Sequence, residues 1–164
     1  MSDIAELLER FRRGAELIAV VSTGAAGAEL DWRPKPEKWS IRYIICHLAD
    51  SEIVCCDRLR RTIAEDNPTL IGYNQDAWAA NLDYSRRKFS QALESFRRLR
   101  NENHELLKGL APEAFQRMAT HSEAGPMSLE ALVLRNAVHV ETHARQIQEL
   151  RAGYKAYRAA AAAN

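Results

Sequence analysis

The feature that most constrains the fold of this chain is a helical repeat of apolar residues, which recurs in four long stretches. In each stretch, apolar side chains are spaced three or four residues apart, which places them on one face of an α-helix. The stretches run from Asp3 to Val21, Ile41 to Glu65, Tyr84 to Lys108 and Ser128 to Tyr154. Four amphipathic helices of this length predict an all-α fold, a four-helix bundle.

The residues at the borders of these stretches support the same interpretation. Asp3, Ser40 and Ser128 each stand directly before an apolar repeat, where a side-chain oxygen can accept hydrogen bonds from the first free amides of a helix. Residues 68–82 contain turn-like segments and could form a short helix, whereas residues 118–127 are expected to be irregular.

Length and composition predict one domain, with 164 residues in all. We expect a single domain over residues 1–155, followed by an Ala-rich tail over residues 156–164 that is frayed. No apolar run reaches the roughly 18 residues that a membrane span needs. The first residues are acidic and amphipathic, unlike a secretory signal, and three cysteines form no disulfide framework. These features favour a cytoplasmic protein with no membrane partner.

The charges are nearly balanced, with 23 Lys and Arg against 22 Asp and Glu. A net charge of +1 argues against a surface dedicated to nucleic-acid binding. The arginine clusters, such as Arg12 with Arg13 and Arg60 with Arg61, are interleaved with acidic residues. We interpret them as solvated faces of helices.

The last stretch carries His139 and His143, four residues apart on one face of the predicted helix. His143 and Asn136 interrupt an apolar stripe where a plain core would carry leucine. Two imidazoles at this spacing can bind one divalent ion, although the pattern alone is weak because core or surface histidines share it.

A third histidine strengthens the metal hypothesis. His47 lies seven residues after the Ser40 cap, roughly 10 Å along the second helix. If that helix packs antiparallel to the last one, the rings of His47, His139 and His143 can reach a similar level. Three imidazoles leave a coordination position open for water or substrate, which is typical of a catalytic metal.

The remaining candidates fit this site less well. His104 and His121 are expected at the surface, although His121 could approach the site if its segment folds over it. Glu141 lies two residues after His139 and should face away, so the motif differs from that of zinc proteases. Cys46 also points away from the metal, while Cys55 lies too far along the helix.

Three polar residues could support the histidines. Asp50, three residues after His47, is the candidate catalytic residue, because it could accept a proton or orient a ligand; an ordinary solvated carboxylate is the alternative. Asn136 and Gln146 flank the histidine pair at three-residue spacing, and we expect them to form hydrogen bonds behind the metal ligands.

Two segments resemble the DinB-like superfamily, also called the DinB/YfiT-like metalloenzymes. The first is WSIRYIICHLADSE from Trp39 to Glu52, preceded by RPKPEK, and the second is HVETHARQI from His139 to Ile147. The resemblance covers roughly residues 4–152. It implies a four-helix bundle with down-up-up-down connections, a metal triad of His47, His139 and His143, and nickel or zinc as the metal. It also implies a homodimer.

The resemblance implies a function only in outline. Members include transferases and isomerases that use a low-molecular-weight thiol, and many have no assigned reaction. We therefore expect a metal-dependent enzyme acting on a small-molecule substrate, either a thiol transferase, which the resemblance slightly favours, or a hydrolase. The alternatives are a module that binds a metal or a ligand without catalysis, and a DNA-damage-response protein that acts through protein contacts.

Overall fold

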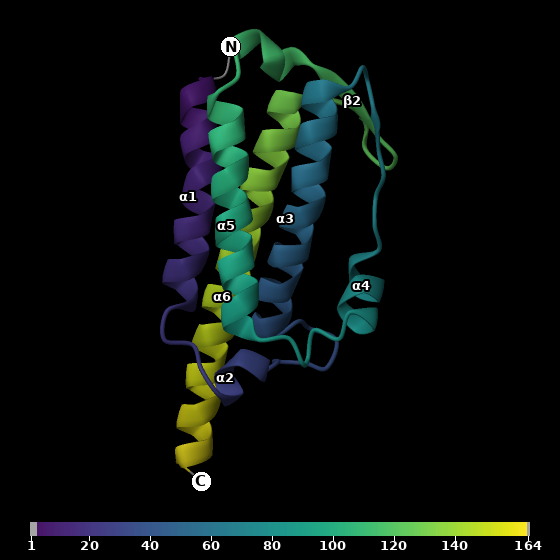
Figure 1. Cartoon of the computed structure of the whole chain (residues 1–164). Coiled ribbons are helices and arrows are strands. Elements are labelled where there is room, and N and C mark those ends of the chain that lie inside the picture. Colours follow the sequence, from purple (N-terminus) through teal and green to yellow (C-terminus); the bar gives the residue numbers. More distant parts are fainter. Residues whose placement is uncertain (1–2, 164) are drawn as a thin grey trace.

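The computed structural model describes residues 3–163 and shows four long helices packed as a bundle (Figure 1). They are α1 (Ile4–Ser22), α3 (Ile41–Ala64), α5 (Phe89–Lys108) and α6 (Leu129–Ala162). In the view of Figure 1, α1 runs down, α3 and α5 run up, and α6 runs down. The predicted bundle and its order of directions are therefore confirmed. A long crossover joins the parallel helices α3 and α5.

Shorter elements lie in the connections. They are the helices α2 (Ala28–Asp31) and α4 (Gln75–Asn81), the 3-10 helix Pro112–Gln116, and the strands β1 (Thr69–Leu70), β2 (Met118–His121) and β3 (Gly125–Ser128). The short helix predicted within residues 68–82 is therefore present as α4.

The strands form a small sheet that corrects the expectation of an irregular segment over residues 118–127. β2 pairs antiparallel with β3, and β1 from the crossover adds in parallel, with Leu70 opposite His121. Gly125 supplies the left-handed φ of 74° in the turn between β2 and β3. The pairing gives partners to backbone groups that an irregular segment would leave to water. It also ties the crossover to the end of the bundle.

The predicted N-caps are confirmed by hydrogen bonds. The Asp3 carboxylate accepts from the amide of Ala5 at 2.9 Å. The Ser40 hydroxyl accepts from Tyr43 at 3.4 Å, and the Ser128 hydroxyl accepts from Ala131 at 3.1 Å. These caps fix the starts of α3 and α6, the two helices that carry the three histidines.

Two helix borders differ from the predictions. α5 begins at Phe89 rather than Tyr84, because Tyr84 lies in a turn with its side chain buried against the bundle. α6 continues past Tyr154 to Ala162, so the described part of the Ala-rich tail is helical rather than frayed. Alanine has the highest helix propensity, which lets the helix extend although these side chains are exposed.

The core consists of two apolar clusters along the bundle axis. One is centred on residues such as Ile18, Ile44 and Ile147, and the other on residues such as Leu59 and Leu132. Glu52 and Arg100 are buried along α3 and α5 between residues of the two clusters, each with 1% of its surface exposed. They form an ion pair at 2.6 Å inside the bundle.

The outer helix faces carry ion pairs. Arg12 pairs with Glu9 at 2.8 Å and with Glu16 at 2.7 Å, and Arg61 pairs with Asp57 at 2.8 Å. These pairs support the interpretation of the arginine clusters as solvated faces. Over residues 3–163, no helix is both long enough and apolar enough to pass through a membrane.

Candidate metal centre

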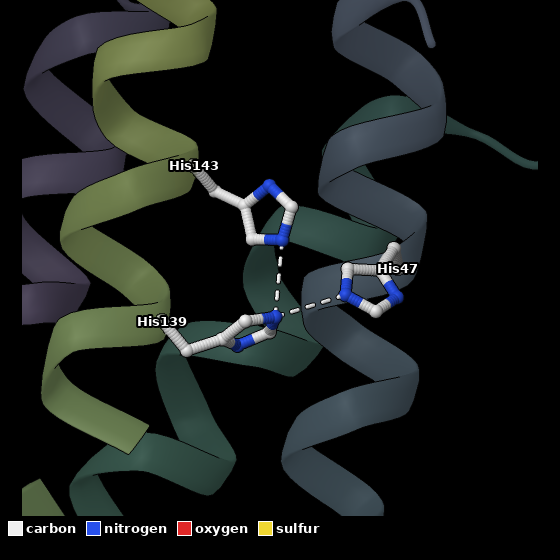
Figure 2. Close-up of side chains that lie close together, drawn as sticks. All are labelled: His47, His139 and His143. Atoms are coloured by element: carbon white, nitrogen blue, oxygen red, sulfur yellow. Dashed lines mark hydrogen bonds between the residues drawn. The ribbon is translucent and has the colours of Figure 1, made fainter. Parts of the chain in front are cut away.

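The three histidines of the sequence analysis meet in the interior of the bundle (Figure 2). His47 projects from α3, and His139 and His143 project one turn apart from α6, which runs in the opposite direction. The Nε2 atom of His139 lies 3.0 Å from Nε2 of His47 and 3.0 Å from Nε2 of His143. The predicted convergence of the three rings is therefore present in the structure.

Burial keeps these imidazoles neutral. It lowers the pKa of His47 to about 3, with a smaller contribution from His143. Burial also lowers the pKa of His139 to about 3, helped by the neighbouring His143 and His47. The pKa of His143 is lowered by burial as well, although its hydrogen bond to Gln146 opposes the shift. Neutral imidazoles have the free nitrogen lone pair that a metal ion requires.

The donor set fits a divalent ion. One nitrogen from each ring lies within 4.8 Å of the others. Nε2 of His139 carries either one proton or one lone pair, so it cannot form a well-directed hydrogen bond with both of the other rings. A cation between the three nitrogens would satisfy all of them, and imidazole is a common ligand for zinc and nickel.

Contacts behind the ligands hold two of the rings in place. The Gln146 side-chain oxygen lies 2.8 Å from Nδ1 of His143. If Nδ1 carries the proton in this bond, Nε2 of His143 is left free to bind metal. The Trp39 ring packs edge-on against His47, with centroids 5.0 Å apart. Gln146 therefore has the contact that the sequence predicted for it.

Asn136 and Asp50 have partners other than the histidine rings. Asn136 donates to the backbone oxygen of Leu132 at 2.8 Å and also lines the cavity beside His139. Asp50 is buried and accepts hydrogen bonds from Tyr84 at 2.7 Å and from Arg87 at 2.8 Å. Within residues 3–163, no hydrogen bond joins Asp50 to the histidines. A catalytic role for Asp50 stays a prediction.

A cavity of about 300 Å³ opens onto His47 and His139. His121 on β2 lines it and is buried, with 3% of its surface exposed, so the expected surface position is wrong for this residue. The small sheet places His121 in this cavity, which agrees with the alternative that its segment folds over the site. Arg58 and Arg135 also line the cavity, and the sequence analysis missed both.

A second cavity of about 500 Å³ reaches His143 and Gln146. Trp39 lines it, and Gln75 at the start of α4 belongs to both cavities. The histidines can therefore be approached from two cavities. His104 and Glu141 lie outside both cavities, and Glu141 pairs with Arg10 at 2.6 Å, facing away as expected.

Three histidines, two buried and one half-buried, meet beside open cavities in a four-helix bundle, an arrangement typical of helical-bundle proteins that bind a metal between their helices. The chain belongs to the DinB superfamily, whose family model matches residues 3–147. The resemblance seen in the two histidine-bearing segments is thereby confirmed.

Relatives carry names that mention metal-dependent hydrolysis. The chain is 30% identical over 122 residues to a protein of Oceanobacillus iheyensis named "Putative metal-dependent hydrolase OB0782", covering 74% of this chain and 70% of the relative. It is similarly related to "Putative metal-dependent hydrolase BH0277" of Halalkalibacterium halodurans, at 30% over 123 residues, with coverage of 74% and 70%.

A solved structure shares the fold. YfiT from Bacillus subtilis, described as "a probable metal-dependent hydrolase with an unusual four-helix bundle topology", superimposes with a TM-score of 0.85. The match covers 93% of this chain and 90% of YfiT at 22% identity. It therefore supports the order of the helices and carries no further conclusion about activity.

The contact between Gln146 and His143 leads to a prediction. Replacing Gln146 with alanine is expected to weaken metal binding by about 10- to 100-fold, because the ring loses the partner that sets its tautomer and orientation. Competition with a chromophoric chelator measures the change. Gln148→Ala, an exposed change on the same helix, is the control and should bind as the wild type does. Equal affinity of the Gln146→Ala and Gln148→Ala variants would show that the contact does not tune the site.

Proposed function

We propose that this protein is a metal-dependent hydrolase of a small-molecule substrate, with zinc or nickel bound by His47, His139 and His143. The observation that carries the proposal is the convergence of three neutral imidazoles whose Nε2 atoms lie close together beside two cavities. The names of the relatives support hydrolysis over the other reactions that this geometry allows.

The protein supplies most of the site before any substrate binds. A divalent ion there would supply Lewis acidity and lower the pKa of a coordinated water toward neutrality. Gln146 holds the His143 ring, and packing against Trp39 holds His47. Because the three imidazoles would hold the ion, a coordination position would remain open for water or substrate. Within residues 3–163, the side-chain oxygen of Asn136 has no hydrogen-bond donor, so it can accept a hydrogen bond from a molecule in the cavity.

Transfer of a low-molecular-weight thiol is the second candidate. One observation favours it: the histidines are reached from two cavities, one beside His47 and His139 and the other beside His143. A transferase needs two substrates at one centre, and two cavities could bring a thiol and an electrophile together there. A homodimer, which the family resemblance implies, and a cytoplasmic location, which the N-terminal residues and the cysteines favour, remain part of the proposal.

The test is a turnover assay with tag-free protein. Chelated, zinc-loaded and nickel-loaded samples are given nitrophenyl esters, simple amides, or an electrophile with a low-molecular-weight thiol. We expect ester or amide cleavage that requires metal and is lost in His143→Ala but kept in His104→Ala. Thiol consumption instead of cleavage would favour the transferase. Equal activity in chelated protein would refute both, and bound metal without any turnover would favour a non-catalytic binding module.

A further inference from the structure

The cavity beside His47 and His139 contains two arginines, and Glu123 is the one carboxylate among the described residues that line it. Arg58 comes from α3 and Arg135 from α6, the same two helices that carry the histidines. Within residues 3–163, neither guanidinium takes part in an ion pair, whereas Arg87, Arg100 and Arg151 each pair with a carboxylate. Burial lowers the pKa of Arg58, and the positive charge of the nearby Arg135 adds to this shift, whereas Tyr73 and Glu123 oppose it. Two like charges held together in this way favour an anion between them.

Arg58 also has an unused donor. Its terminal nitrogen donates to the backbone oxygen of Ile71 at 2.6 Å, which anchors the side chain to the crossover. Its Nε atom is buried and has no hydrogen-bond partner among the described residues. A buried donor without an acceptor is unfavourable, and the most direct remedy is an acceptor that enters with a ligand.

Other polar groups that line this cavity supply further hydrogen-bond donors. The Nδ1 atom of His121 accepts from the amides of Glu123 and Ala124, at 3.2 and 3.3 Å. The neutral His121 ring therefore carries its proton on Nε2, where it can donate. Burial raises the pKa of Tyr73 to about 12, so its hydroxyl stays protonated as well. Glu123 is the acidic residue of the wall, and it is exposed at the rim.

The second cavity, beside His143, is lined mainly by residues of the opposite charge. Glu37, Asp76 and Glu149 line it, with Lys38 as its basic residue. The three histidines therefore border both a cationic cavity and a mainly acidic one. A small molecule with one negative end would be oriented by this difference, with its anion toward Arg58 and Arg135.

We propose that the substrate carries a carboxylate or phosphate group, which Arg58 and Arg135 bind while the reacting bond lies at the three histidines. The inference rests on the proposed function and adds the substrate class to it. Helix geometry supports the placement. Arg58 follows His47 by eleven residues, about three turns on the same face, and Arg135 precedes His139 by one turn. The cavity volume of about 300 Å³ suits a small metabolite.

The test measures anion binding without turnover. Tag-free protein is used with its metal, and again after chelation and removal of the chelator, because a metal ion can itself bind anions. Glutarate, inorganic phosphate and the neutral glutaramide are titrated at low ionic strength and followed by amide chemical shifts in NMR spectra. We expect one or both anions to bind saturably in both samples, with the preferred anion identifying the charged group of the substrate. Glutaramide should not bind.

Matched variants locate the binding. Arg135→Gln changes an exposed side chain and should fold normally, and it is expected to weaken anion binding at least 10-fold. Arg58→Gln should do the same, whereas Arg58→Lys retains part of the affinity and guards against loss of folding. Arg97→Gln, an exposed change on α5, is the control and should bind as the wild type does.

Two results would overturn the inference: no saturable anion binding by the wild type, or unchanged binding by Arg135→Gln and Arg58→Gln. Because no turnover is measured, either result leaves the hydrolase proposal intact. An inactive enzyme that still binds anions through these arginines would instead count against the hydrolase proposal alone.

Discussion

Replacing Glu52 with alanine is expected to lower the free energy of unfolding by about 3–5 kcal/mol, although Glu52 lies outside the metal centre. Glu52 accepts two hydrogen bonds from Arg100, at 2.6 and 3.0 Å, and one from Asn103 at 2.8 Å. The guanidinium also stacks over the Phe11 ring at 4.0 Å. Without Glu52, the charge of Arg100 would stay buried with no opposite charge beside it. Urea unfolding followed by circular dichroism measures the loss.

Two further variants show whether the buried charge causes this loss. Glu16→Ala removes an exposed ion pair with Arg12 and should change the free energy of unfolding by less than about 0.5 kcal/mol. The double variant Glu52→Leu with Arg100→Met should recover part of the stability, because both charges are gone, although the buried Asn103 amide loses its acceptor. A loss below about 1 kcal/mol in Glu52→Ala would contradict this account of the core.

Replacing His139 with alanine is expected to weaken binding of zinc by about two to three orders of magnitude. Four-ligand structural zinc sites bind with about 10–16 kcal/mol, so one ligand contributes about 3–4 kcal/mol, or about 10²- to 10³-fold in Kd. His139 is the ring whose Nε2 atom lies 3.0 Å from both of the others, so its loss opens the centre of the group. Competition against a chelator of known affinity measures the change.

The control for His139→Ala is His104→Ala. His104 lies on α5 beside Glu105 and outside the histidine group, so its variant should bind metal as the wild type does. Both variants should keep the helical content of the wild type, since neither replaces a large apolar side chain. Wild-type affinity in His139→Ala would exclude this residue as a ligand.

The sequence predicted the parts of this protein that depend on local rules. Helical periodicity placed the four long helices, and the hydroxyl and carboxylate caps placed their starts to within a residue at α1, α3 and α6. The convergence of the three histidine rings could also be predicted. Residue spacing shows which helix face carries each of His47, His139 and His143, and antiparallel packing of the two helices sets the height of the rings along the bundle. Each of these inferences depends only on the spacing of residues within one helix or on the packing of two helices.

The features that the sequence analysis missed depend on contacts between distant segments. The sheet pairs β1 with β2, although α4 and α5 separate these strands in the sequence. Strands of two to four residues are too short to show a periodic pattern that would predict such pairing. His121 enters the cavity only through this sheet. The prediction of a frayed tail was wrong for another reason. The composition of the tail resembles a low-complexity segment, but alanine favours a helix.

Signals for the missed charged residues were present in the sequence. Arg100 and Asn103 stand on the apolar stripe of α5, between Phe96 and Leu107, where a solvated arginine would be out of place. Arg58 and Arg135 lie on the faces of His47 and His139, three turns and one turn away. Listing the cations on the same helix face as the proposed ligands would have identified both, though not which side of the metal they occupy.

The central claim is that His47, His139 and His143 bind one divalent metal ion, and the metal content of the purified protein tests it most directly. Elemental mass spectrometry is applied to tag-free wild type and to His143→Ala, because a histidine tag would bind nickel itself. The account predicts close to one zinc or nickel ion per wild-type chain and loss of that metal in the variant. Absence of metal from the wild type, even after incubation with zinc and nickel, would contradict it.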